Sequence, residues 1–127
     1  MLFKKFHHVA IICSDYEASK RFYIDLLGFE IISELYRAPK QSWRLDLRSG
    51  DCHIELFTFP DPPPRPSTPE AQGLRHLAFE VDDVAQTVRE LEAKGIAVEP
   101  IRVDELTGKH FTFFQDPDGL PLELYER

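Results

Sequence analysis

The chain has 127 residues, of which 43% are apolar and 12% aromatic, enough to bury the core of one compact domain. Its formal net charge is −7 and no block of basic residues offsets it, so we expect no nucleic-acid partner. The longest apolar run near the N-terminus, Val9 to Cys13, is too short for a signal-peptide core or a membrane span. We therefore expect a cytoplasmic protein without a membrane partner.

The first half of the chain predicts one strand, one amphipathic helix and three further strands. A β-branched run over 8–14 is typical of a strand. Asp15 can cap a following helix, whose apolar residues recur with helical spacing and which Gly28 ends. Three more strands are expected at 30–36, 43–48 and 54–59.

The second half predicts the same order of elements. A strand is expected at 76–81, followed by a helix that Asp83 caps and Gly95 ends. Further strands are expected at 97–103, 110–115 and 122–125. Between the halves, residues 60–73 contain six of the ten prolines, which favours a stiff connector because proline cannot donate to a sheet.

The two halves are related by an internal repeat. His8-Val9-Ala10-Ile11 corresponds to His76-Leu77-Ala78-Phe79, and Ile54-Glu55-Leu56-Phe57 corresponds to Leu122-Glu123-Leu124-Tyr125, so that histidine and glutamate are 47 residues apart in both halves. Duplication explains this best. We predict an α+β protein with one domain over 1–127, in which tandem βαβββ modules span about 6–59 and 74–126 around the connector 60–73.

Strand alternation predicts which side chains share a face. In each first strand the histidine shares a face with the alanine two residues later, and in each last strand the glutamate alternates with aliphatic residues. The aliphatic residues should pack against the helices, so the histidines and glutamates take the opposite faces. If two curved mixed sheets enclose a cleft, four side chains converge there: His8, Glu55, His76 and Glu123. Alternation places His7 on the face opposite His8, away from this cleft.

Two imidazoles and two carboxylates without thiolates suit one divalent ion: an octahedral Ni, Co, Mn or Fe ion, or a catalytic Zn ion. The alternative is that both glutamates are solvated on an outer face and the histidines are ordinary core or surface residues. The identical spacing of the two pairs favours the metal site. His53 shares the face of Glu55 and is a rival ligand, although its repeat counterpart, Pro121, cannot bind a metal.

Short motifs follow one another along essentially the whole chain: His8-Val9-Ala10, Phe22-Tyr23, Leu26-Leu27-Gly28-Phe29, Ile54-Glu55-Leu56, Leu74-Arg75-His76-Leu77-Ala78-Phe79, Asp116-Pro117-Asp118-Gly119 and Leu122-Glu123. Together they resemble the vicinal oxygen chelate superfamily, in particular its bacterial members of the glyoxalase I and bleomycin-resistance type. The resemblance implies paired βαβββ modules around a cleft, with His8, Glu55, His76 and Glu123 as metal ligands.

The resemblance also implies an activity. It indicates a metal-dependent isomerase or lyase, similar to lactoylglutathione lyase, that moves a proton on a small oxygenated substrate. Glu123 is the expected base, with Glu55 a ligand and partner in proton transfer. Two alternatives stay open: an epimerase or dioxygenase of the same superfamily, and a metal-free module that binds and sequesters a small molecule.

Substrate contacts are expected on strands next to the ligands. An inward Arg44 or Arg48 would favour an anionic substrate. Glutathione-using relatives generally have a basic residue after their Phe-Tyr pair, where this chain has Ile24-Asp25, so the substrate is left open. We expect a homodimer, with the metal site built within one chain or across the dimer. The residues expected to contact the substrate are Arg44, Asp46, Phe57, Thr112 and Phe114.

Overall fold

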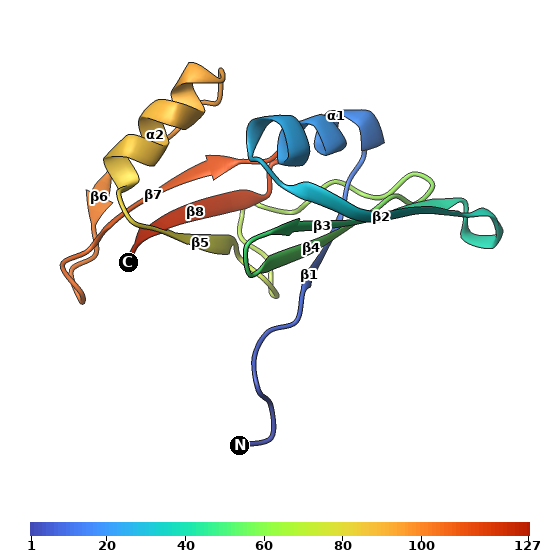
Figure 1. Ribbon diagram of the computed structural model, residues 1–127, viewed down its shortest axis with the longest axis horizontal. Coiled ribbons are helices and arrows are strands. Elements are labelled where there is room, and N and C mark those ends of the chain that lie inside the picture. The colour runs from blue at the N-terminus through green and yellow to red at the C-terminus, as the bar shows by residue number, and fades with distance from the viewer. The chain divides into compact units, whose positions relative to one another are not determined.

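The computed structural model describes all 127 residues, which divide into two compact units, Met1–Pro63 and Pro64–Arg127. The boundary lies inside the predicted connector 60–73. Each unit contains one four-stranded mixed sheet (Figure 1). The predicted α+β class with two βαβββ modules is therefore confirmed, while the organisation as a single domain stays a prediction.

The first unit has the strand order β1-β4-β3-β2, with β1 parallel to β4 and the other neighbours antiparallel. Its helical segment is an α-helix that continues into a π-helical turn. The elements are β1 (Val9–Ile12), α1 (Tyr16–Arg21), the π-helical turn (Phe22–Leu26), β2 (Glu30–Arg37), a short 3-10 turn (Ala38–Lys40), β3 (Ser42–Ser49) and β4 (Cys52–Phe57).

The predicted signals for the ends of the first helix are confirmed. The Asp15 carboxylate accepts a hydrogen bond from the backbone N–H of Ala18, which otherwise has no partner inside the helix. Gly28 has a φ of +83°, a left-handed conformation that glycine adopts without strain and that ends the helical segment. The π-helical turn buries Phe22 and Tyr23, and the Tyr23 ring packs edge-on against Phe29.

The second unit repeats the topology, with the order β5-β8-β7-β6 and β5 parallel to β8. Asp83 caps its helix by accepting from the N–H of Gln86. Its elements are β5 (Leu77–Val81), α2 (Val84–Ala93), β6 (Arg102–Val103), β7 (His110–Gln115) and β8 (Pro121–Glu126).

The expected strand at 97–103 is much shorter than predicted, since β6 contains only Arg102 and Val103. The preceding segment still follows β7: the N–H of Glu99 donates to the Phe113 carbonyl at 2.9 Å, and the Thr112 hydroxyl donates to the Glu99 carbonyl at 2.7 Å. Pro100 has no N–H for a ladder, so a regular strand cannot form through it.

Each sheet has one buried aliphatic face and one polar or aromatic face. In the first unit Leu45, Leu47, Ile54 and Leu56 are buried. In the second, α2 lies against β7 and β8, and Leu122 and Leu124 are buried. The alternating glutamates therefore lie on the opposite faces, as strand alternation predicts. No helix combines the length and apolar character needed to cross a bilayer.

Candidate metal centre

The first histidine and glutamate come together in the first unit through the parallel pairing of β1 with β4. Ala10 is the register partner of Glu55, and His8 precedes Ala10 by two residues on the same face. The His8 Nε2 atom lies 3.5 Å from Glu55 Oε1. The Glu55 side chain is only 8% exposed, so its charge needs compensation from its neighbours.

The second pair is built in the same way inside the second unit. Ala78 is the register partner of Glu123, and His76 precedes Ala78 by two residues. The His76 Nε2 atom lies 3.3 Å from Glu123 Oε1, and the Glu123 side chain is 12% exposed. The repeat in the sequence is thus a repeat in side-chain geometry.

Both pairs fit a divalent metal ion. Two ligand atoms at metal distances of about 2.0–2.2 Å, in neighbouring octahedral or tetrahedral positions, lie about 3.0–3.5 Å apart. The two N–O distances, 3.5 and 3.3 Å, agree with this spacing. Imidazole nitrogen and carboxylate oxygen are ligands for Zn, Ni, Co, Mn and Fe ions. Each unit therefore presents a two-atom half-site of suitable chemistry.

The two glutamates differ in their remaining contacts. Arg44 Nη2 donates to Glu55 Oε2 at 3.1 Å, leaving Oε1 turned toward His8. Arg44 also makes two bonds to Asp46, at 2.9 and 3.2 Å, and this guanidinium lowers the pKa of the Asp46 carboxyl. Glu123 has only its contact with His76. Glu55 is held on two sides, whereas Glu123 is held on one.

The first unit contains a second group of metal-binding type. One ligand atom each from Asp46, His53 and Glu55 lies within 4.8 Å of the others. Asp46 and Glu55 are register partners on β3 and β4, and His53 precedes Glu55 by two residues on the same face. This group shares Glu55 with the His8 pair, so the two arrangements compete for one carboxylate.

His7 is closer to this group than alternation predicts. Its Nδ1 atom lies 2.9 Å from Nδ1 of His8, and its ring centroid is 5.6 Å from that of His53. Alternation fails here because β1 begins only at Val9, so the two histidines precede the regular strand. No sequence signal fixes the start of that strand to one residue.

The structure separates the expected substrate contacts into two groups. Arg44 and Phe57 are register partners on the face of Glu55, beside Asp46. Thr112 and Phe114 pair with Leu124 and Leu122, on the buried face away from Glu123. The place beside Glu123 is taken instead by Phe113, its register partner, while the role of Thr112 and Phe114 as substrate contacts stays a prediction.

The mismatch has a simple cause. The register partners Asp46 and Glu55 are nine residues apart, whereas Phe113 and Glu123 are ten apart, so the hairpin of β7 and β8 contains one additional residue between equivalent partners. The offset that relates Glu55 to Glu123 therefore does not hold for β7. Positions on β3 that are transferred to β7 with this offset are one residue out of register. A shift of one residue exchanges the two faces of a strand.

Comparison with known proteins identifies the family. Residues 5–124 match the model of the Glyoxalase/Bleomycin resistance protein/Dioxygenase superfamily, and the chain belongs to this superfamily. Two uncharacterized bacterial proteins align over nearly their full length. YwkD of Bacillus subtilis (strain 168) is 62% identical over 128 residues, covering 100% of both chains. YaeR of Escherichia coli (strain K12) is 59% identical over 125 residues, covering 98% of this chain and 97% of YaeR.

Solved structures agree with this assignment. The glyoxalase family protein from Enterococcus faecalis superimposes with a TM-score of 0.94 at 52% identity, covering 99% of this chain and 100% of that one. The superfamily includes enzymes: 2-epi-5-epi-valiolone epimerase from Actinomyces sp is 29% identical over 140 residues, covering 93% of this chain and 76% of the epimerase. A glyoxalase I mutant from Zea mays shares the fold, with a TM-score of 0.80 at 18% identity, covering 95% of this chain and 44% of that one.

Proposed function

We propose that this protein is a metal-dependent isomerase or lyase of glyoxalase I type, acting on a small oxygenated substrate. The observation that supports it most is the duplicated half-site. In both units a glutamate less than one-eighth exposed lies 3.3–3.5 Å from a histidine Nε2 atom. Two carboxylates withdrawn from water need a cation, and one divalent ion compensates both. In this proposal His8, Glu55, His76 and Glu123 are its ligands.

When bound, a divalent ion supplies Lewis-acid stabilisation of negative charge that develops on substrate oxygens. The chain itself supplies the proton transfer. Glu123 takes a proton from the hydroxyl-bearing carbon beside a carbonyl and delivers it to the carbonyl carbon, while the hydroxyl proton passes to the former carbonyl oxygen, so that the substrate is isomerised without a net redox change. Glu123 suits this role because His76 is its one contact, so its carboxylate can turn toward a substrate carbon.

Glu55 has a more fixed role in the proposal. Arg44 holds Oε2 at 3.1 Å, which fixes the carboxylate plane and aims Oε1 at His8. A hydrogen-bonded carboxylate of this kind is a well-oriented ligand. Arg44, Asp46 and Phe57 form the neighbouring surface, which a substrate bound beside Glu55 would meet.

The quaternary structure belongs to the same proposal. We propose a homodimer, in which the two half-sites that form one centre come from the same chain or from two copies. Both arrangements use identical contacts, since the modules are repeats. Sedimentation equilibrium with and without added metal tests the oligomeric state, and we expect a dimer. A monomer that binds metal fully would contradict the homodimer and would leave only a metal centre built within one chain.

The rival metal group, Asp46 with His53 and Glu55, can be separated by two matched substitutions. Calorimetric titration with Zn²⁺ and Ni²⁺ should show affinity reduced by at least about tenfold in His76→Ala and nearly unchanged in His53→Ala. The reverse result would assign the ion to the first unit alone and remove the four-ligand centre. Circular dichroism confirms that each variant is folded.

The activity is tested on a panel of α-oxoaldehyde thiol adducts that differ in their thiol. The proposal expects turnover of at least one adduct, loss of turnover in chelated enzyme, and recovery on adding a divalent ion. A protein that binds no divalent ion, shows no thermal shift with Ni, Co, Mn or Zn, and turns over none of the panel would instead be a sequestering module.

A further inference from the structure

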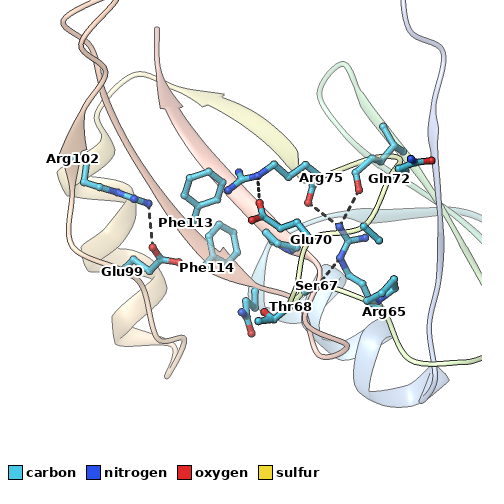
Figure 2. Close-up of a pocket in the computed structure, with 15 residues that line it drawn as sticks. Arg65, Ser67, Thr68, Glu70, Gln72, Arg75, Glu99, Arg102, Phe113 and Phe114 are labelled. Carbon is cyan, nitrogen blue, oxygen red and sulfur yellow. Dashed lines mark hydrogen bonds and ion pairs between the residues drawn. The ribbon is translucent and has the colours of Figure 1, made fainter.

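The second unit contains a cavity that the proposed metal chemistry does not use. Its volume is about 590 Å³, and it lies between the segment 65–75, which includes the end of the connector, and strands β6 to β8 (Figure 2). Cavities that hold small molecules have volumes of about 300–1,000 Å³. The size alone therefore permits an organic ligand of modest size, and the lining residues indicate its chemistry.

One wall connects the cavity to the second histidine and glutamate. Phe113 lines the cavity and is the register partner of Glu123. Its ring centroid lies 5.0 Å from that of His76, in an edge-on contact. A ligand held in the cavity against Phe113 is therefore next to the pair to which we assign metal binding and proton transfer.

Two guanidinium groups flank the same ring. The Cζ atoms of Arg75 and Arg102 lie 6.0 and 5.4 Å from the centroid of Phe113, and Figure 2 shows the ring between the two side chains. Such cation–π contacts hold arginine side chains over an aromatic surface while their N–H groups remain available. The cavity thus has one guanidinium on each side of an aromatic ring, in a chain whose net charge is −7.

The internal partners of these arginines are easily replaced. Arg75 pairs with Glu70 at 2.7 Å and Arg102 pairs with Glu99 at 3.1 Å, and all four side chains are at least half exposed. Arg75 also contacts His76, with 3.1 Å between Nη1 and Nδ1, and this contact leaves its other N–H groups for a ligand once Glu70 is displaced. Exposed ion pairs stabilise a protein by only about 0.2–1 kcal/mol, so a ligand anion can displace the glutamate. A guanidinium has five N–H donors and accepts a carboxylate with two parallel bonds.

A third arginine in the lining has a different role. Arg65 donates to the Ser67 hydroxyl at 3.1 Å and to the Leu74 and Arg75 carbonyls at 3.0 and 2.8 Å. These bonds close the connector on itself and fix the residue that precedes His76. Arg65 is therefore a positioning residue for the cavity wall.

We propose that this cavity binds an organic carboxylate, with the anionic group on Arg75 or Arg102 and an apolar or planar part against Phe113. The binding of a carboxylate in this cavity does not depend on the proposed function. The identification of that carboxylate with the substrate does rest on the proposed function. It implies that the substrate carries a carboxylate at one end and the reacting carbon at the other, near His76 and Glu123.

Benzoate is a suitable probe, with benzamide as the neutral molecule of the same shape. We expect benzoate to shift the Arg75 and Arg102 Nε–H and Phe113 NMR signals, with a dissociation constant on the order of millimolar. Benzamide should bind at least about tenfold more weakly, because it lacks the charge that the guanidiniums recognise. The titration is run with chelator present, so its outcome does not depend on metal.

Matched substitutions give effects of opposite sign. Arg75→Gln and Arg102→Gln should each weaken benzoate binding about fivefold, whereas Arg89→Gln, on the exposed face of α2, should not. Glu70→Gln should strengthen benzoate binding by roughly two- to fivefold, because it removes the competing carboxylate. Glu90→Gln is the control: it removes the same charge outside the cavity and should change benzoate binding little.

Equal binding of benzoate and benzamide, or unchanged binding in both Arg75→Gln and Arg102→Gln, would overturn the proposal. So would benzoate shifts confined to residues outside the cavity. Failure of the metal proposal is distinguishable, because it would abolish metal titration while leaving chelator-insensitive benzoate binding in place. Folded variants are recognised by the unchanged remainder of their spectra.

Discussion

Glu55 and Glu123 hold equivalent positions in the two repeats, yet their neighbours differ in kind. By register, Asp46 in the first unit corresponds to Phe113 in the second. One glutamate therefore lies among a guanidinium and a second carboxylate, and the other beside an aromatic ring. The repeated sequence predicted that the two glutamates share a type of face. It could not predict their different surroundings, because one additional residue in the hairpin of β7 and β8 changes which side chains of β7 share the face of Glu123.

This difference predicts that the substitutions Glu55→Gln and Glu123→Gln have different effects on metal binding and on turnover. Glu123→Gln should retain the fold and bind metal more tightly than Glu55→Gln does, while its turnover falls by a factor on the order of 10² or more. Steady-state kinetics on an active thiol adduct, with metal content measured in the same samples, checks this. Undiminished turnover in Glu123→Gln would remove Glu123 from the mechanism.

At the scale of elements, helix caps and helix ends were well predicted and strand lengths less so. Asp15, Asp83 and Gly28 act as expected, because helix ends depend on local hydrogen bonds and backbone conformation. The strand over 97–103 was predicted too long, because the apolar pattern was followed through Pro100, which has no N–H to donate to a ladder.

The second helix cap gives a direct stability test. Asp83→Ala should lower the free energy of unfolding by about 1 kcal/mol, since the N–H of Gln86 loses its acceptor. Asp82→Ala is the matched control, because Asp82 is highly exposed and makes only a 3.6 Å ion pair with Arg127. Urea unfolding followed by circular dichroism measures both, and equal losses would show that the cap bond contributes nothing of its own.

The contact between α1 and β2 predicts a pH dependence. Glu34 accepts from Lys20 at 2.8 Å and from the Tyr16 hydroxyl at 2.5 Å, and these bonds hold the pKa of Glu34 below its usual value. A carboxyl whose pKa is lowered by folding contributes stability above its unfolded pKa, and this is lost as the pH falls through the folded pKa.

Between pH 6 and pH 3, the Tm of wild type should therefore fall further than that of Glu34→Gln. At pH 7 the variant should melt about 1–4 °C lower, which is modest because the group is partly exposed. Differential scanning calorimetry across this range provides the measurement. Parallel Tm curves for the two proteins would contradict the role given to Glu34.

At the scale of the whole molecule, duplication was the most informative feature of the sequence. The 47-residue spacing predicted two half-sites, and each unit brings its histidine and glutamate within 3.5 Å. The cavity beside Phe113 was not foreseen. Its arginines, Arg75 and Arg102, lie just before β5 and on the short strand β6, and neither is an arginine repeated at the equivalent position of the first unit, so the repeat gave no signal for them.

We propose that one divalent ion is bound by both repeats together. Crystals grown with Co²⁺ or Zn²⁺, with data collected at the absorption edge, locate that ion by its anomalous scattering. The account predicts a single strong site, with donor atoms of His8, Glu55, His76 and Glu123 at about 2.0–2.3 Å. An ion held by Asp46, His53 and Glu55 without the second repeat, or four splayed side chains around no ion in excess metal, would contradict it.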